Sequence, residues 1–441
     1  MDGNKNEVKP KQLLSVWDGI VLICGMVIGA GIFKAPSIVA GNTSSGAEFL
    51  GAWVLGGLVS LCGALVYAEL ATRYPETGGE YAFLSRGMGR GVAFVFAWSR
   101  MTVIQTGAIA AVAFVFGDYA SEIFRLGERS SAIYAGLGVV ALTALNVAGT
   151  VESKGLQKVM QFLLFAGLAF LVVAGLIAGA PAKPGAASAG GSFGLAMIFV
   201  LLTYGGWNEA AYLSGEVRDA RRNMIRILLA GIAAVTVIYL LVNVAYLAAL
   251  GLGGMRASKA VAADVMRAAT GDKGALLLAF IVCLAALTTM NAAIFTGART
   301  TYALGRDFRF FSGLGAWREA GSTPANALIL QGAIALVLVL ASTLTPDGFS
   351  AMVAYTSPVF WTFFLLTALT LFVFRRREPQ SASFRVPLYP IVPIAFCIAC
   401  VYMLYSSINY VRFAVEFGVA VFAGLAIMAL GIPLYFFARN R

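Results

Sequence analysis

Apolar runs, each on the order of 20 residues long, follow one another along most of the chain and constrain its fold more than any other feature. A helix of roughly that length is needed to cross ~30 Å of hydrocarbon. Of the 441 residues, 60% are hydrophobic and 12% are charged, a composition too apolar for a soluble protein. The sequence therefore predicts an all-α integral membrane protein that is embedded in a lipid bilayer.

The runs predict about twelve transmembrane helices. An even number of spans puts both termini on one side, and the short loops on that side carry most of the lysines and arginines. We therefore expect cytoplasmic termini in a plasma membrane. The predicted spans cover residues 16–40, 49–72, 91–120, 131–149, 156–179, 193–216, 225–251, 274–303, 325–343, 349–374, 388–409 and 413–438.

The charged and reactive residues exclude several classes of function. The net charge is +11, but the basic residues are spread over short loops, so no nucleic-acid partner is expected. The sequence has no histidine, which removes the commonest metal ligand and acid-base group. Its five cysteines all lie in apolar runs and imply no disulfide framework. We predict no metal site.

Small residues interrupt two of the predicted spans near their middle. Gly29, Ala30 and Gly31 lie in the first span, and Gly205 and Gly206 lie in the sixth. A broken helix leaves backbone groups unsatisfied in hydrocarbon unless it lines a cavity. Corresponding breaks in two sets of five helices indicate a transporter built from inverted repeats. The alternative is that the glycines only permit close helix packing.

The breaks also indicate what is bound. Free N–H groups at the start of a half-helix attract an anion, and free C=O groups at the end of one attract a cation. An amino acid carries both charges on one small centre. The nearby polar residues Gln105, Tyr204, Asn208 and Asn291 are neutral, which favours a neutral amino acid. Glu209, if it faces the cavity, would instead favour a cationic amino acid or a polyamine.

Four motifs carry a family resemblance: GMVIGAGIF (25–33), YAELATRYPETGGEYAF (67–83), TYGGWNEAAYLSGEVRDARRN (203–223) and TMNAAIFTGARTTYALGRD (289–307). They resemble the amino acid-polyamine-organocation permeases, most closely the L-type amino acid transporter light subunits and their bacterial relatives. The resemblance implies a LeuT-like 5+5 inverted repeat with discontinuous helices 1 and 6, working by alternating access. The implied domains are a cytoplasmic tail (1–15), a first repeat (16–179), an inverted second repeat (192–374) and two peripheral helices (388–438).

Binding roles follow from the resemblance, position by position. The amides of Gly29, Ala30 and Gly31 would hold the substrate carboxylate. Carbonyl oxygens would hold the substrate ammonium, and Asn208 would brace the unwound sixth helix. The full set of expected substrate-binding residues is Val27, Gly29, Ala30, Gly31, Gln105, Leu202, Thr203, Gly205 and Asn208.

The chain departs from the family pattern at three places. The loop SEIFRLGERSS (121–131) has no cysteine where light subunits have one, so no disulfide-linked glycoprotein partner is expected. Leu202 stands where relatives often have an aromatic gate. Leu164 stands where many relatives have a lysine on helix 5.

The missing lysine raises the question of ion coupling. The resemblance suggests a sodium site from Thr288 and Thr289 with the backbone of Val27 and Ala30. The alternative is that both threonines bond to their own helix. Uncoupled uniport or exchange is favoured over coupling to sodium or protons, and no other cofactor is expected.

Charged residues within the spans are predicted to have partners, because an unpaired charge in hydrocarbon costs several kcal/mol. We expect Arg100 to pair with Glu209, or else to reach the lipid headgroups. Glu69 and Arg73 are expected to form a simple pair on one helix surface. A cytoplasmic gate of ion pairs is expected from Asp18, Glu216 and Arg299.

Other functions are weaker alternatives. A membrane enzyme needs a positioned nucleophile, base or metal, and none stands out in the spans. A channel needs a continuous polar stripe, whereas the polar residues gather at mid-depth. A solute sensor on a transporter fold would share the same site. The sequence therefore favours a secondary transporter of amino acids.

Overall fold

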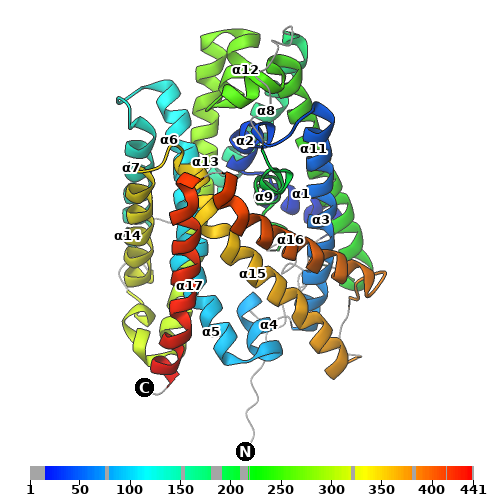
Figure 1. The fold of residues 1–441 in the computed structure, drawn as a ribbon, viewed down its shortest axis with the longest axis vertical. Coiled ribbons are helices and arrows are strands. Elements are labelled where there is room, and N and C mark those ends of the chain that lie inside the picture. The colour runs from blue at the N-terminus through cyan, green and yellow to red at the C-terminus, as the bar shows by residue number, and fades with distance from the viewer. Residues whose placement is uncertain are drawn as a thin grey trace, which may run out of the picture.

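A computed structural model of the chain describes residues 15–74, 79–149, 154–179, 191–208, 217, 219–318, 323–379, 384–413 and 415–439. Within these ranges the protein is built of helices (Figure 1). Ten of the described helical segments are long and apolar enough to cross a membrane. They are α3 (Gly46–Arg73), α5 to α6 (Arg90–Ile123), α7 (Ser130–Ala148), α8 (Lys154–Ala178), α11 (Ala220–Ala257), α13 (Asp272–Asp307), α14 (Ala325–Ser342), α15 (Gly348–Arg377), α16 (Ile391–Phe413) and α17 (Gly418–Arg439).

Two further spans are interrupted, as the glycine pattern predicts. The first consists of α1 (Val16–Val27), the 3-10 turn η1 (Ala30–Phe33) and α2 (Ala35–Gly41). The sixth begins as α9 (Phe193–Thr203), which ends at a turn over residues 204–206, and residues 207–208 are helical again. These two and the ten long segments together confirm the predicted membrane architecture with discontinuous helices 1 and 6.

Two short helices occupy corresponding places in the two repeats. α4 (Gly79–Met88) follows α3, and α12 (Val261–Thr270) follows α11. They lie at opposite ends of the bundle, α4 at the end where α17 terminates and α12 at the other (Figure 1). Such opposite placement is what an inversion of one repeat relative to the other requires. The two ends of the bundle are called the α4 end and the α12 end.

The helices pack in two groups. In the first group, α1, α2 and α3 pack against α11, and α9 packs between α2 and α3. In the second group, α6, α7 and α14 pack around α13. The turn η1 contacts α6 and α13 as well as α2 and α9, so the break in the first helix lies at the seam between the groups. α16 and α17 are peripheral and pack mainly on α15.

The prediction that Glu69 and Arg73 form a simple surface pair is wrong. Glu69 is fully buried and Arg73 is 6% exposed. The Glu69 carboxylate accepts hydrogen bonds from Arg73 Nη2 at 3.2 Å, from Arg375 Nε at 2.8 Å and from the Val386 amide at 2.7 Å. The cluster therefore joins α3 to α15 and to the segment that follows α15. A carboxylate can be buried here because three donors surround it.

Replacing Glu69 by Gln should destabilise the protein by about 3 to 5 kcal/mol, because the change leaves two arginines without their carboxylate. The loss is measured as a lower thermal unfolding temperature of the purified protein in detergent. Glu48→Gln is the control, since Glu48 accepts from Ser44 on the surface at the start of α3 and should cost about 1 kcal/mol or less. Equal shifts for the two variants would contradict a structural role for the buried cluster.

Candidate functional site

The two helix breaks touch each other inside the bundle. A Cβ added to Gly31 would lie 3.3 Å from Thr203 Oγ1, and one added to Gly206 would lie 2.5 Å from the carbonyl oxygen of Met26. Gly206 also has a φ of +107°, a conformation that favours glycine. The glycines therefore allow the backbone of each broken helix to lie directly against the other.

The first break presents peptide N–H groups. α1 ends at Val27, Ile28 and Gly29 are extended, and η1 begins at Ala30. Among the described residues, the amides of Gly29, Ala30 and Gly31 donate to no acceptor outside η1. Adjacent free amides at the start of a helical turn form a favourable environment for an anion such as a carboxylate.

The second break closes a tight turn. The Gly205 amide donates to the Leu202 carbonyl at 3.0 Å, and the Thr203 hydroxyl donates back to the Phe199 carbonyl at 2.8 Å. The Tyr204 amide also points to the Leu202 carbonyl, so this carbonyl is already engaged within the turn. The Leu202 side chain is 37% exposed, whereas the other side chains of α9 are buried or half-buried.

Tyr239 of α11 joins the ends of both broken helices. Its hydroxyl lies 3.0 Å from the Val27 carbonyl and 2.8 Å from the Thr203 carbonyl, the last residues of α1 and α9. Because the hydroxyl carries one proton, it donates to one carbonyl at a time. Its ring packs edge-on against Trp53 and Tyr204 at centroid distances of 5.5 and 5.0 Å. Tyr239 thereby fixes the spacing of the two breaks.

Sequence reasoning did not single out Tyr239. It stands in an apolar run with no neighbouring motif, where an aromatic residue is expected to pack in the core. One signal was available, since a phenol hydroxyl in hydrocarbon needs a hydrogen-bond partner. A tyrosine at mid-span facing a broken helix satisfies that need with a freed carbonyl.

Several polar residues expected near the substrate form hydrogen bonds between helices of the second group. Gln105 Nε2 donates to the Ala293 carbonyl of α13 at 2.8 Å. Asn146 Nδ2 of α7 donates to Asn291 Oδ1 at 2.6 Å. Gln105 begins α6 directly after a π-helical turn, η2 (Arg100–Ile104). These amides stiffen the wall that faces the first break.

The residues proposed for ion coupling bond within their own helix. The Thr288 and Thr289 hydroxyls donate to the carbonyls of Leu284 and Ala285, each at 2.9 Å. Thr289 Oγ1 nevertheless faces the break, because a Cβ on Gly29 would lie 3.7 Å from it. The hydroxyl oxygen keeps its acceptor lone pairs toward the site.

Arg100 has a partner that the sequence did not suggest. Its Nη1 lies 3.2 Å from Glu80 Oε2 of α4, and Glu80 Oε1 accepts from Asn208 Nδ2 at 3.3 Å. Asn208 therefore braces the segment after the second break through α4. Glu209, the partner expected for Arg100, lies outside the described residues.

The expected cytoplasmic gate is only partly described. Asp18 forms a capping box with Ser15 at the start of α1. The guanidinium of Arg299 stacks on the ring of Phe295, 3.3 Å from its centroid, and donates to the Phe295 carbonyl. Glu216 lies outside the described residues.

Comparison with known proteins decides the family. The family model described as "Amino acid permease" matches residues 14–431. The chain belongs to the amino acid permease family. The match spans both breaks and the peripheral helices, and it confirms the resemblance carried by the four motifs. The chain is thus a membrane permease and not an enzyme.

Relatives of this permease are named for amino acid transport. The chain is 29% identical to the b(0,+)-type amino acid transporter 1 of Rattus norvegicus over 88% of this chain and 81% of that protein. It is 26% identical to the serine/threonine exchanger SteT of Bacillus subtilis (strain 168) over 98% of both chains. It is 27% identical to the large neutral amino acids transporter small subunit 2 of Mus musculus over 95% of this chain and 80% of that protein.

Removing the Tyr239 hydroxyl should weaken substrate binding about tenfold, because it removes the hydrogen bond that holds the ends of α1 and α9 at a fixed spacing. Tyr239→Phe is tested by equilibrium binding of labelled substrate to purified permease. Tyr134→Phe is the control, since its hydroxyl bonds to the Phe124 carbonyl on the surface at 3.0 Å. Unchanged affinity in Tyr239→Phe would show that the bridge does not shape the site.

Proposed function

We propose that this permease carries small neutral amino acids across a membrane by alternating access, binding them where the two helix breaks meet. The observation that carries the proposal is the direct contact of the breaks, at Gly31 with Thr203 and at Gly206 with Met26. Freed amides on one side and carbonyls on the other match the carboxylate and ammonium of an amino acid. Binding at interrupted helices between inverted repeats is the mode that such transporters use.

The described residues around the breaks favour a substrate whose side chain is neutral. Thr203, Tyr204 and Thr289 are uncharged. The described charges on the two broken helices or tied to them are paired, Arg100 with Glu80 and Lys34 with Asp118. The name of the Bacillus subtilis relative, a serine/threonine exchanger, supports small hydroxylated or aliphatic substrates and exchange as the mode of transport.

Orientation and partners form part of the same proposal. Arg73, Arg86, Arg90 and Arg375 lie in or beside the helices at the α4 end, which favours that end as the cytoplasmic one. Both termini would then lie in the cytoplasm of a bacterium, and the α12 end would face outward. The loop between α6 and α7 has no cysteine, so the permease would act without a disulfide-linked partner.

Proteoliposomes test the substrate class directly. Uptake of labelled serine should be stimulated by unlabelled serine inside the vesicles and reduced by external threonine or alanine. It should be indifferent to sodium and pH gradients if transport is uncoupled exchange. Stronger competition by lysine or putrescine would favour the cationic alternative, and failure of all twenty amino acids and common polyamines to compete would overturn the proposal.

Gly31→Val should abolish measurable substrate binding while leaving membrane insertion intact. The branched side chain would enter the 3.3 Å space before Thr203 and crowd the proposed carboxylate position. Gly51→Val is the matched control, because a Cβ at Gly51 of α3 meets nothing within 4 Å. Binding is measured by isothermal calorimetry on protein that elutes as a single species. Tight binding retained by Gly31→Val would contradict the proposed geometry.

A further inference from the structure

A cavity of about 580 Å³ opens at the α12 end, and a buried ammonium group forms part of its lining. The ammonium belongs to Lys34, which lies between η1 and α2 in the first broken helix. The Lys34 side chain is only 5% exposed. Ser37, one turn further along α2, also lines the cavity. The cavity is called the outer vestibule.

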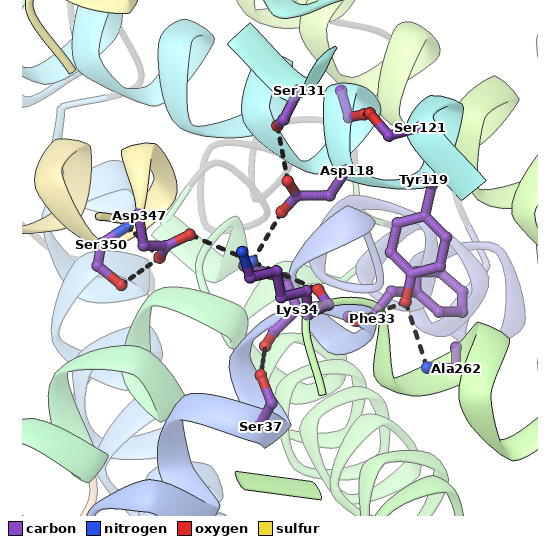
Figure 2. A network of polar contacts seen from close by, with 12 residues as sticks. Phe33, Lys34, Ser37, Asp118, Tyr119, Ser121, Ser131, Ala262, Asp347 and Ser350 are labelled. Carbon is purple, nitrogen blue, oxygen red and sulfur yellow. Dashed lines mark hydrogen bonds and ion pairs between the residues drawn. The ribbon is translucent and has the colours of Figure 1, made fainter. Parts of the chain in front are cut away.

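Lys34 is held by two carboxylates from different parts of the bundle. Its Nζ lies 2.7 Å from Asp118 Oδ2 of α6 and 3.3 Å from Asp347 Oδ1, the residue that caps α15 (Figure 2). Asp118 Oδ1 also accepts from the Ser131 hydroxyl of α7 at 2.6 Å. Asp347 Oδ2 accepts from the Ser350 amide at 3.0 Å. Each carboxylate is thus fixed in place by its own helix or a neighbouring one before it meets the ammonium.

The ion pairs outweigh the cost of burial at Asp347. Burial alone would raise the pKa of this carboxyl group, but the Lys34 ammonium and the hydrogen bonds from Ser350 lower the pKa below its ordinary value. Both partners of the pair are therefore charged. A buried ion pair is weak evidence for stability, since apolar residues of similar volume commonly stabilise as well or better.

Lys34 is the last of three consecutive residues that anchor the outer half of the first helix. The Ile32 carbonyl accepts from the Tyr246 hydroxyl of α11 at 3.3 Å. The Phe33 carbonyl accepts from the Tyr119 hydroxyl of α6 at 2.7 Å (Figure 2). Tyr246 belongs to the same group as α2, whereas Tyr119 and Asp118 belong to the second group. Phe33 and Lys34 therefore connect the two groups across their seam.

Opening toward the α12 end requires the two groups to separate at this seam. Alternating access proceeds by rocking or gating of one set of helices against the other around a fixed site. α2 packs against α9 and α11, while α6 packs against α13. Any motion that draws α2 away from α6 must break the contact between Lys34 and Asp118.

We propose that Lys34, Asp118 and Asp347 form an ion-pair latch that keeps the outer half of the first broken helix closed over the substrate site, and that the latch opens in every transport cycle. The inference rests on the proposed function, because it takes the α12 end as the outer face. Lys34 is a positioning residue: it acts on the substrate through η1 and α2.

Thiol accessibility at Ser37 reports the state of the latch. In a variant with all five native cysteines replaced by serine or alanine, Ser37→Cys places a thiol on α2, where the native side chain is 7% exposed. A membrane-impermeant maleimide is applied to right-side-out and to inverted vesicles. Adding Lys34→Met should raise the labelling rate about tenfold in right-side-out vesicles only, the shift in population expected when about 1.4 kcal/mol of closing energy is lost.

Transport kinetics give a readout that a purely structural defect would not produce. With the latch weakened, the outward-facing state is more populated, so the KM for external substrate should fall. The maximal exchange rate should fall as well, because closing from the outside becomes less favourable. General damage to the protein would instead raise KM or remove binding.

Two further variants keep the test decisive if Lys34→Met fails to fold. Asp347→Asn removes one ion pair but keeps a good helix cap, and Asp118→Asn removes the other without changing shape. Both should label faster than the Ser37→Cys parent. Glu122→Gln is the matched control on the same helix as Asp118, because its partner Arg267 retains Asp264 and Asp272. It should label and transport like the parent.

The latch is refuted if the folded variants at Lys34, Asp118 or Asp347 label at the parental rate and keep the parental KM. The labelling needs no knowledge of the substrate, so it stands apart from the competition assay that tests the proposed function. Faster labelling in inverted vesicles alone would place the latch on the cytoplasmic side and refute the inference as stated.

Discussion

The structure depends on how it satisfies the peptide groups that two broken helices release in hydrocarbon. Each unsatisfied group would cost several kcal/mol, so a break persists only where partners are supplied. Three tyrosines bond to freed carbonyls: Tyr239 at Val27 and Thr203, Tyr246 at Ile32 and Tyr119 at Phe33. The amides of the first break receive no comparable partner among the described residues. The breaks therefore carry an excess of donors, which suits an anionic group better than a cation alone.

The buried charges also connect elements that lie far apart in the sequence. Glu69 with Arg375 fixes α3 to α15, and Glu80 with Arg100 and Asn208 ties α4 to the third span and to the segment after the second break. At the other end, Lys34 with Asp118 ties the first broken helix to the second group. Two of the three clusters thus act directly on a broken helix. Since removing one member leaves an uncompensated buried charge, each cluster strongly favours one arrangement of its helices.

The sequence predicted the fold and the breaks because both are local properties. Apolar run length sets the spans, and the glycines mark the breaks, of which Gly31 and Gly206 lie where the two broken helices touch. Partners were not predictable in the same way. Arg100 was expected to meet Glu209, but Glu80 lies on a short helix whose position depends on packing with α5 and α15. Tyr239 and Lys34 were not singled out, because their partners are far away in the sequence. Only the folded chain places Tyr239 beside the ends of α1 and α9, and Lys34 between Asp118 and Asp347.

The two interrupted helices are related by the inverted repeat, yet the halves that lie toward the α12 end are anchored differently. α9 is tied within its own group, where the Tyr204 hydroxyl that follows it donates to the Trp53 carbonyl of α3 at 2.9 Å and Tyr239 of α11 holds Thr203. η1 and α2 are also tied across the seam, at Phe33 and Lys34. Separation of the groups would leave the anchors of α9 intact and break the two anchors of the first helix that cross the seam, at Phe33 and Lys34. In the proposed latch, η1 and α2 are therefore the segment whose release commits the permease to opening at the α12 end.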